Sequence, residues 1–170
     1  MNVTQHTDSP ESAEPAMTLS VSAHLTPTRF GPLPFLAEQI WSTESPLPGF
    51  EALQRFGLIS LQAERPFVWL QSLEDAAVSF LLVPAAHFGL RYPHLAAASM
   101  PMVMVLLPEQ AGQPLRPHRQ APLLFDSQTG LFSQHIVEAA EVDGGGMFLP
   151  QAAVEQADGF AQRVLALNVR

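Results

Sequence analysis

Cysteine and lysine are both absent from this chain of 170 residues. Without cysteine the protein has no disulfide, no thiolate metal ligand and no thiol nucleophile. Without lysine it cannot contain a phosphate-binding P-loop, whose lysine reaches the phosphates of the nucleotide. Positive charge is scarce too, because eight arginines face 16 acidic residues and the formal net charge is −8. Only Arg116 and Arg119 lie close together, and we therefore expect no direct binding of nucleic acid.

Long hydrophobic runs are missing as well. The longest, Leu95–Leu107, includes Ser99 and Pro101 and is too short to cross a bilayer. The N-terminus is polar and acidic, and it lacks the basic and apolar regions of a signal peptide. We therefore expect a cytoplasmic protein without a membrane partner. The acidic balance suits a basic protein partner, since opposite charge accelerates association.

The polar residues show no pattern typical of a catalytic or metal site. None of the six histidines has a second histidine or a carboxylate at zinc-ligand spacing, and no Gly-x-Ser-x-Gly nucleophile motif occurs. The run Gly144–Gly146 does not form a dinucleotide-binding fingerprint. The adjacent Glu74 and Asp75 fit the solvated tip of a turn better than a catalytic pair. We expect no cofactor, no metal and no enzymatic activity.

The stretch from Pro66 to Phe80 gives the clearest structural signal. Alternation places Phe67, Trp69 and Gln71 on one face of a strand and the residues between them on the other. A short acidic turn and a second strand follow. Both faces are mostly apolar, which is typical of strands buried in a sandwich or a barrel. We expect Trp69 to be a core residue rather than an anchor for a partner.

Many short apolar runs, broken by Pro, Gly and Ser, predict an all-β fold, either a small β-barrel or a sandwich, with minor helical content. Asp126–Gly130 predicts a turn that joins two late strands. Glu51–Phe56 favours one helical turn with Leu53 and Phe56 facing inward. The expected strands are Phe35–Trp41, Leu58–Leu61, Phe67–Ser72, Val78–Val83, Met102–Leu107, Leu123–Phe125 and His135–Ala139.

The composition divides the chain into three parts. Residues 1–24 are rich in Ser, Thr, Glu and Pro, which predicts a disordered extension. Residues 25–143 form the predicted barrel domain. Asp143–Gly146 marks the start of a C-terminal extension, residues 144–170. The spacing of Val154, Ala157 and Ala161 favours a C-terminal helix there, whereas alternation in Arg163–Val169 favours a strand.

Several short motifs occur in a fixed order through the middle of the chain. They are Thr28–Gly31, Leu47–Glu51, Pro66–Ser72, Ser79–Phe80, the spaced residues Pro84, Phe88 and Tyr92, and Ala121–Leu123. In this order and spacing they resemble the flagellar assembly factor family, FliW, over roughly residues 28–139. The sequence also departs from the family pattern, since Arg91 stands where the family usually has an acidic residue.

The resemblance implies a small barrel that binds other proteins and performs no catalysis. Members of the family bind flagellin before export, and they bind the translational regulator CsrA and relieve its repression of flagellin mRNA. Both proteins are therefore the partners that the resemblance implies here. The candidate contact residues lie in loops: Glu51, Glu74, Asp75, Arg91 and Tyr92.

Two other interpretations are compatible with the residues. One is a paralogue that uses the same barrel in another secretion or regulatory system and does not contact the regulator. The other is a barrel that binds a small molecule, which ranks last because no polar residues converge in the sequence.

Overall fold

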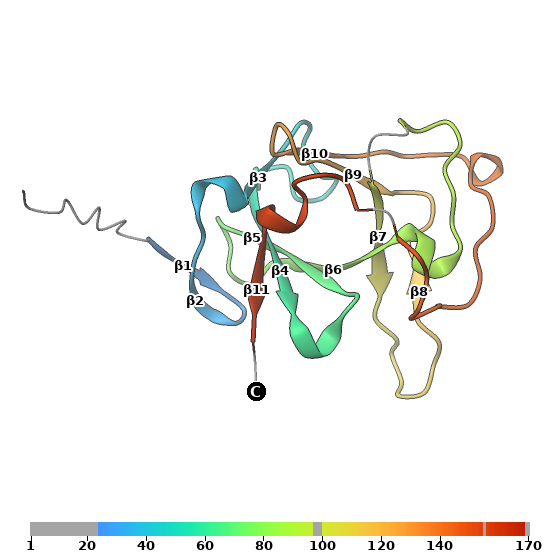
Figure 1. The fold of residues 1–170 in the computed structure, drawn as a ribbon, viewed down its shortest axis with the longest axis horizontal. Coiled ribbons are helices and arrows are strands. Elements are labelled where there is room, and N and C mark those ends of the chain that lie inside the picture. Colours follow the sequence, from blue (N-terminus) through green and yellow to red (C-terminus); the bar gives the residue numbers. More distant parts are fainter. Residues whose placement is uncertain (1–23, 97–99, 155, 169–170) are drawn as a thin grey trace, which may run out of the picture.

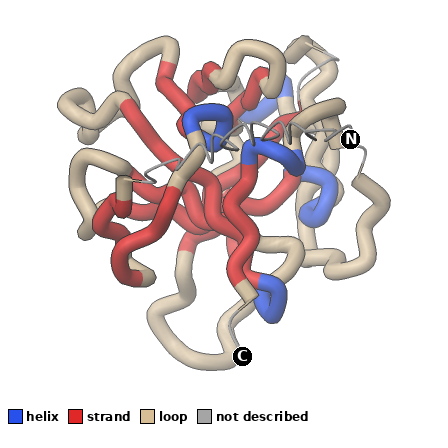
Figure 2. The backbone as a smooth tube through the Cα atoms, turned by 60° about the vertical axis from the view of Figure 1, so that its left-hand side comes forward, coloured by secondary structure: helices blue, strands red, loops and turns tan. Residues whose placement is uncertain are grey.

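The computed structural model describes residues 24–96, 100–154 and 156–168. Within them the regular structure is almost entirely β, and the helical pieces are single 3₁₀ turns (Figures 1 and 2). The strands are β1 (Leu25–Thr28), β2 (Gly31–Pro34), β3 (Ile40–Thr43), β4 (Arg55–Leu61), β5 (Val68–Ser72), β6 (Ser79–Pro84), β7 (Met100–Leu106), β8 (Arg116–Pro117), β9 (Leu123–Asp126), β10 (Leu131–Gln134) and β11 (Val164–Leu167). The 3₁₀ turns are η1 (Ala37–Gln39), η2 (Gln62–Glu64), η3 (Ala85–Phe88), η4 (Ala139–Glu141) and η5 (Ala161–Arg163).

The main sheet closes on itself. Its order is β4-β3-β10-β9-β7-β6-β5, and β5 pairs again with β4, so that seven strands form a barrel. Each of these neighbours is antiparallel except β3 and β10, which pair in parallel. Closure leaves these strands with few free edges, which is how barrels avoid unpaired backbone groups. The predicted all-β barrel is confirmed.

The interior of the barrel is filled by one face of each strand. In β7, Met100 and Met102 point inward while Val103 and Val105 point outward, and the same alternation holds in β4 to β6. Aromatic rings pack against one another there, with the Trp41 and Phe125 rings 5.0 Å apart and the Phe56 and Phe132 rings 5.4 Å apart, both edge to face. The alternation predicted for the strand of Pro66–Ser72 is therefore present.

Two further apolar clusters cover the outside of the barrel. One lies over β6 and β7 and includes Phe88, Tyr92 and Val142. The other lies over β4 and β5, under the hairpin of β1 and β2, and includes Trp69. The expectation for Trp69 was a core position. Instead the ring is half-buried on this outer face, where Arg29 lies 4.0 Å above it and its Nε1–H donates to Glu64 at 3.1 Å.

Three local predictions were wrong: two strands lie elsewhere, and one helical turn does not form. The strand predicted at Phe35–Trp41 is interrupted by η1, and β3 starts at Ile40. The strand predicted at His135–Ala139 lies earlier, at β10, because the Asp126–Gly130 turn is tight and the chain re-enters the sheet at Leu131. Glu51–Phe56 forms no helical turn, since Phe56 belongs to β4. The turn predicted at Asp126–Gly130 is present and joins β9 to β10.

The chain after Gly144 contains no α-helix within the described residues, which corrects the C-terminal helix that the spacing favoured. It contains η5 and then β11, so the alternative strand reading was the right one. β11 pairs in parallel with the second half of β4, from Leu58 to Leu61. It lies along the same edge of β4 that pairs with β3 in the first half of the strand. Phe160, only 3% exposed, packs with Trp41 and Phe125 in the barrel interior. The predicted extension thus contributes to the core.

The predicted disordered segment, residues 1–24, lies outside the described residues except for His24.

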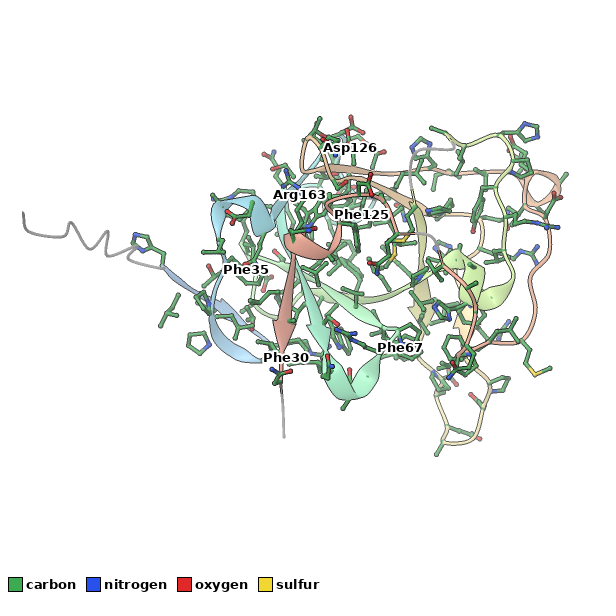
Figure 3. The ribbon with its side chains drawn as sticks, viewed as in Figure 1. Phe30, Phe35, Phe67, Phe125, Asp126 and Arg163 are labelled. Carbon is green, nitrogen blue, oxygen red and sulfur yellow. The ribbon has the colours of Figure 1, made fainter. Side chains whose placement is uncertain are left out.

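Arg163 ties this C-terminal segment to the barrel (Figure 3). Its Nε–H donates to the carbonyl of Ser127 at 2.5 Å and its Nη1–H to the carbonyl of Glu38 at 2.8 Å. Its own carbonyl accepts from the indole N–H of Trp41 at 3.1 Å. One residue of the C-terminal segment therefore joins two regions distant in the sequence, the η1–β3 segment and the β9–β10 turn.

Replacing Phe160 with Ala should lower the free energy of unfolding by about 3–5 kcal/mol, because the ring is buried among other aromatic side chains. The matched control is Met147→Ala, in the same C-terminal segment but 82% exposed, which should change stability by less than about 0.5 kcal/mol. Urea unfolding of both variants measures the difference. Equal, small effects would show that residues 144–168 are dispensable for the barrel.

Candidate functional site

The first acidic loop, residues 44–54, connects β3 to β4 and contains a tight turn. Pro48 occupies the second position and Gly49, with φ of +83°, the third, while the N–H of Phe50 donates to the carbonyl of Leu47 at 2.9 Å. These are the requirements of a type II turn, in which the third position needs positive φ and so favours glycine. The carboxylate of Glu51 accepts from the Gly49 N–H at 2.9 Å and stays exposed to solvent.

The second acidic loop, residues 73–78, joins β5 to β6. The hydroxyl oxygen of Ser72 accepts from the N–H groups of Glu74 and Asp75 at 3.1 and 3.0 Å. Asp75 in turn accepts from the N–H of Ala77 at 2.9 Å, as Asp and Ser commonly do in turns. Asp75 thus lies in an exposed turn, as the sequence predicted. The loop is therefore held by local side-chain contacts before any partner arrives.

Glu74 joins the two loops. Its Oε2 accepts from the N–H of Gln54 at 2.6 Å and of Arg55 at 3.1 Å, and its Oε1 lies 3.5 Å from Nε of Arg55. The pKa of Glu74 is lowered mainly by the hydrogen bond from the backbone of Gln54. The pKa of Glu51 is lowered mainly by the hydrogen bond from the backbone of Gly49. Both carboxylates are charged at neutral pH. We call loops 44–54 and 73–78 together the acidic end of the barrel.

The charges at the acidic end are not equally available. Arg55 pairs with Glu74, whose side chain is only 28% exposed, so Glu74 acts mainly as a link between the loops. Glu51 and Asp75 are exposed and form no ion pair within the described part of the chain. Together with Glu44, which is also exposed, these carboxylates carry the negative charge at this end of the barrel.

Gln71 is a residue of this end that the sequence did not single out as functional. It is fully buried, its Oε1 accepts from the N–H of Arg29 at 3.1 Å, and its amide donates to the carbonyls of Ala76 and Val78. It thus fixes the second acidic loop to the N-terminal hairpin. The signal that could have found it is a glutamine in the middle of an otherwise apolar strand, where burial requires hydrogen-bond partners.

The other two predicted contact residues lie elsewhere. The loop of Glu74 and Asp75 precedes β6 and the segment of Arg91 and Tyr92 follows it, so the strand, about 20 Å long at its six residues, separates the two groups. Arg91 is exposed, and its backbone exchanges two hydrogen bonds of 2.9 Å with Asp143.

Tyr92 does not lie on an exposed loop surface, which corrects the expectation. It is 7% exposed and its hydroxyl donates to the carbonyl of Arg119 at 2.7 Å. Burial raises the pKa of Tyr92 to about 12. The hydroxyl is protonated at any physiological pH, and its hydrogen bond holds the backbone of residue 119.

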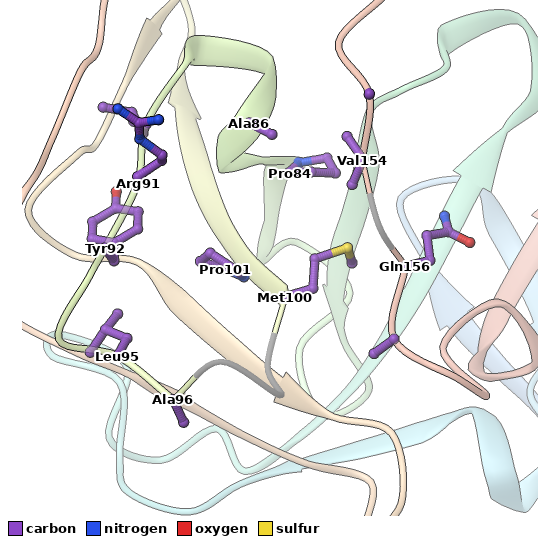
Figure 4. Close-up of a pocket in the computed structure, with 13 residues that line it drawn as sticks. Pro84, Ala86, Arg91, Tyr92, Leu95, Ala96, Met100, Pro101, Val154 and Gln156 are labelled. Carbon is purple, nitrogen blue, oxygen red and sulfur yellow. The ribbon is translucent and has the colours of Figure 1, made fainter.

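Arg91 and Tyr92 line a pocket of about 470 Å³ (Figure 4). One wall is formed by residues of the segment from Pro84 to Leu95, and the facing wall by Val154 and Gln156 of the C-terminal segment. The lining is mostly apolar, and Arg91 is the single charged residue among the described residues that form it.

Within residues 24–96, 100–154 and 156–168, no group of three His, Asp or Glu side chains is arranged to hold a metal ion. In the same part of the chain, no helix is long and apolar enough to cross a membrane.

These features define a class of protein, a small closed barrel with rigid charged loops at its ends. The comparisons with known proteins then identify the family. The family model described as FliW protein matches residues 24–143, and the chain belongs to the FliW family.

The individual relatives agree with this assignment. The flagellar assembly factor FliW of Leptospira interrogans serogroup Icterohaemorrhagiae serovar Lai is 28% identical over 139 residues, covering 74% of this chain and 93% of that protein. The FliW of Thermosipho africanus is 41% identical over 56 residues, 33% of this chain and 39% of its own. A crystal structure of the flagellar assembly factor FliW has the same fold, with a TM-score of 0.58 at 22% identity, and the match covers 76% of this chain and 99% of that one.

Glu74→Gln should lower the free energy of unfolding at pH 7 by about 0.5–1 kcal/mol, a value reduced for the partial exposure of the side chain. Because the pKa of Glu74 is lowered in the folded protein, its contribution is present above the unfolded pKa and is lost as the pH falls through the folded value. Thermal melts of wild type and variant should therefore converge between about pH 5 and pH 3. A difference in melting temperature that stays constant over this range would contradict the role of the charge.

Proposed function

We propose that this protein is a flagellar assembly factor that binds flagellin, the translational regulator CsrA or both by direct protein contact. The observation that carries the proposal is the family match over residues 24–143, together with a barrel that presents two rigid acidic loops. The protein acts in the cytoplasm, binds no RNA itself and catalyses no reaction.

The acidic end supports a basic partner such as an RNA-binding regulator. Glu51 and Asp75 are exposed, form no ion pair within the described residues and lie in fixed loops, so a partner would meet them without an ordering cost for these loops. A protein that covers the basic surface of the regulator would block its access to RNA. Relief of repression then follows from protein contact alone, without any contact between this chain and RNA.

Arg91 and Tyr92 contribute in a different way. Arg91 offers a positive charge at the rim of its pocket, and Tyr92 fixes the neighbouring segment through its hydrogen bond to residue 119. A second partner with different charge, such as flagellin, would suit this region better than the acidic end. Separate surfaces would allow the two partners to be distinguished by mutation.

Titration calorimetry against purified flagellin and purified CsrA tests the proposal directly. We expect heat of binding with at least one of them, with a dissociation constant in the micromolar range or tighter. Absence of heat with both, using folded protein, would favour the paralogue that serves another secretion or regulatory system.

The charge of the acidic end should act on the association rate. The double variant Glu51→Gln/Asp75→Asn should slow association with CsrA by about threefold to tenfold at 50 mM salt, and this effect should disappear near 0.5 M salt, because salt screens exposed charges. The matched control is Glu109→Gln/Glu138→Gln, which removes the same charge from exposed positions outside the acidic end. Stopped-flow or surface-based kinetics measure both. Equal slowing by both pairs would show that net charge, and not this end of the barrel, steers the partner.

A further inference from the structure

A groove of about 750 Å³ lies on the side of the barrel where β8 pairs with β7. One wall is the segment Pro114–Pro117 with Arg119, and the other is the segment Gly145–Phe148. Leu90, almost fully buried, contributes from the segment that follows η3. Among the described residues that line this groove none is acidic, although acidic residues outnumber basic ones two to one in the chain.

No carboxylate of the described residues forms an ion pair with the arginines of the groove. Among the described residues the one ion pair joins Arg55 and Glu74, so neither Arg116 nor Arg119 has a carboxylate partner. Arg119 is nevertheless held in place, because its Nη2–H donates to the carbonyl of Gly144 at 2.9 Å and its own carbonyl accepts from Tyr92. Arg116 is exposed and forms no hydrogen bond through its guanidinium within the same part of the chain. Two guanidinium groups thus face the groove with free donors.

The remaining surface of the groove is apolar and exposed. Met147 on one wall is 82% exposed. Pro114 and Arg116 also line a neighbouring hollow together with Glu109 and with Leu106 and Leu107, which are 50% and 64% exposed. An exposed apolar surface of this kind is uncommon on a monomer unless it binds something.

The walls of the groove are rigid. β8 is anchored on β7 through Leu106 and Val105, and prolines stand at positions 114 and 117. Phe148 is stacked on Phe67 with ring centres 5.2 Å apart and packs against Phe88. A side chain at Gly145, where φ is +104°, would lie 2.7 Å from Leu90 and 3.2 Å from Arg119, so glycine is required for the wall to approach this closely.

We propose that this groove binds an extended acidic segment of a partner protein, with carboxylates paired to Arg116 and Arg119 and a large apolar side chain against Met147 and Leu115. The charge is complementary to such a segment, and arginine forms paired hydrogen bonds with carboxylates. The proposal goes beyond the function proposed above. It assigns a second surface whose partner has the opposite charge from the partner of the acidic end.

Two other occupants fit the observations less well. The described chain starts at β1, and Figure 1 places β1 and β8 on opposite sides of the molecule, so an occupant from the chain's own N-terminus would have to cross the barrel. In a two-fold dimer through this face, a second copy would bring the same two arginines against the groove, and both copies carry a net charge of −8. A separate acidic partner meets neither obstacle.

Fluorescence anisotropy of the full-length protein with two labelled peptides tests the proposal. The acidic probe is Glu-Leu-Asp-Phe-Glu-Leu-Asp-Phe, and in the control probe every acidic residue is replaced by Lys. We expect the acidic probe to bind and the basic probe to bind at least about tenfold more weakly, with affinity for the acidic probe falling as salt rises.

Three substitutions then locate the site. Arg116→Gln should weaken binding of the acidic probe by about fivefold and Met147→Glu by about tenfold. Arg65→Gln is the matched control, since Arg65 is exposed and lies outside the groove, and it should leave binding within about twofold. Far-ultraviolet circular dichroism and thermal melts verify that each variant is folded.

The proposal would be overturned by equal binding of the two peptides, by no binding of the acidic peptide at millimolar protein, or by equal effects of Arg116→Gln and Arg65→Gln. It would also be overturned if a peptide of residues 1–23 displaced the acidic probe with higher affinity, since the groove would then belong to the chain itself. Concentration-dependent self-association that Met147→Glu abolishes would assign the groove to a second copy instead. None of these results depends on whether flagellin or CsrA binds the protein.

Discussion

Strand β4 lies against three other strands, and the closure of the barrel depends on how its two edges are shared. One edge pairs with β5 from Phe56 to Ile59. The other edge pairs with β3 over its first residues and with β11 over its last ones. Gly57 leaves room for the ring of Phe35 against this strand, because a side chain at position 57 would lie 2.2 Å from that ring. The N-terminal hairpin, the barrel and the C-terminal segment all meet at this strand.

Closure at β4 also determines where the charged loops lie. The loop before β4 and the loop after β5 meet at the same end because the two strands are antiparallel neighbours, and Glu74 joins them at the backbone of Gln54 and Arg55. Arg91 and Arg119 lie near residues 143–146, since the backbone of Arg91 pairs with Asp143 and Arg119 donates to the carbonyl of Gly144. Arg116, from β8, lines the same groove as Arg119. The chain thus carries a group of arginines outside the acidic end, although its net charge is −8.

The strands with strict alternation could be predicted from the sequence, because the two faces of β5, β6 and β7 are both apolar and the turns between them are clear. The resemblance to FliW was likewise carried by local motifs, and Leu47–Glu51 proved to be a turn whose proline and glycine are required by its geometry. The error at Phe35–Trp41 has a physical cause, since an apolar run of this length is compatible with either a strand or a 3₁₀ turn.

The long-range features could not be read from the sequence. β11 is a short alternating run that becomes a strand only because β4 has a free edge, and Phe160 becomes a core residue only because η5 brings it to Trp41. Trp69 was expected in the core and is half-buried, whereas Tyr92 was expected to be exposed and is buried. The burial of each depends on a segment far away in the sequence, at Arg29 for Trp69 and at Arg119 for Tyr92. The grouping of the candidate contact residues into two distant sites likewise required the topology.

Hydrogen exchange of the protein with and without saturating CsrA tests the central claim, that a basic partner docks on the acidic end. The account predicts slower exchange in residues 44–54 and 72–78, and unchanged exchange in residues 114–119 and 144–148. Protection confined to the second pair of segments, or spread evenly over the barrel, would contradict it.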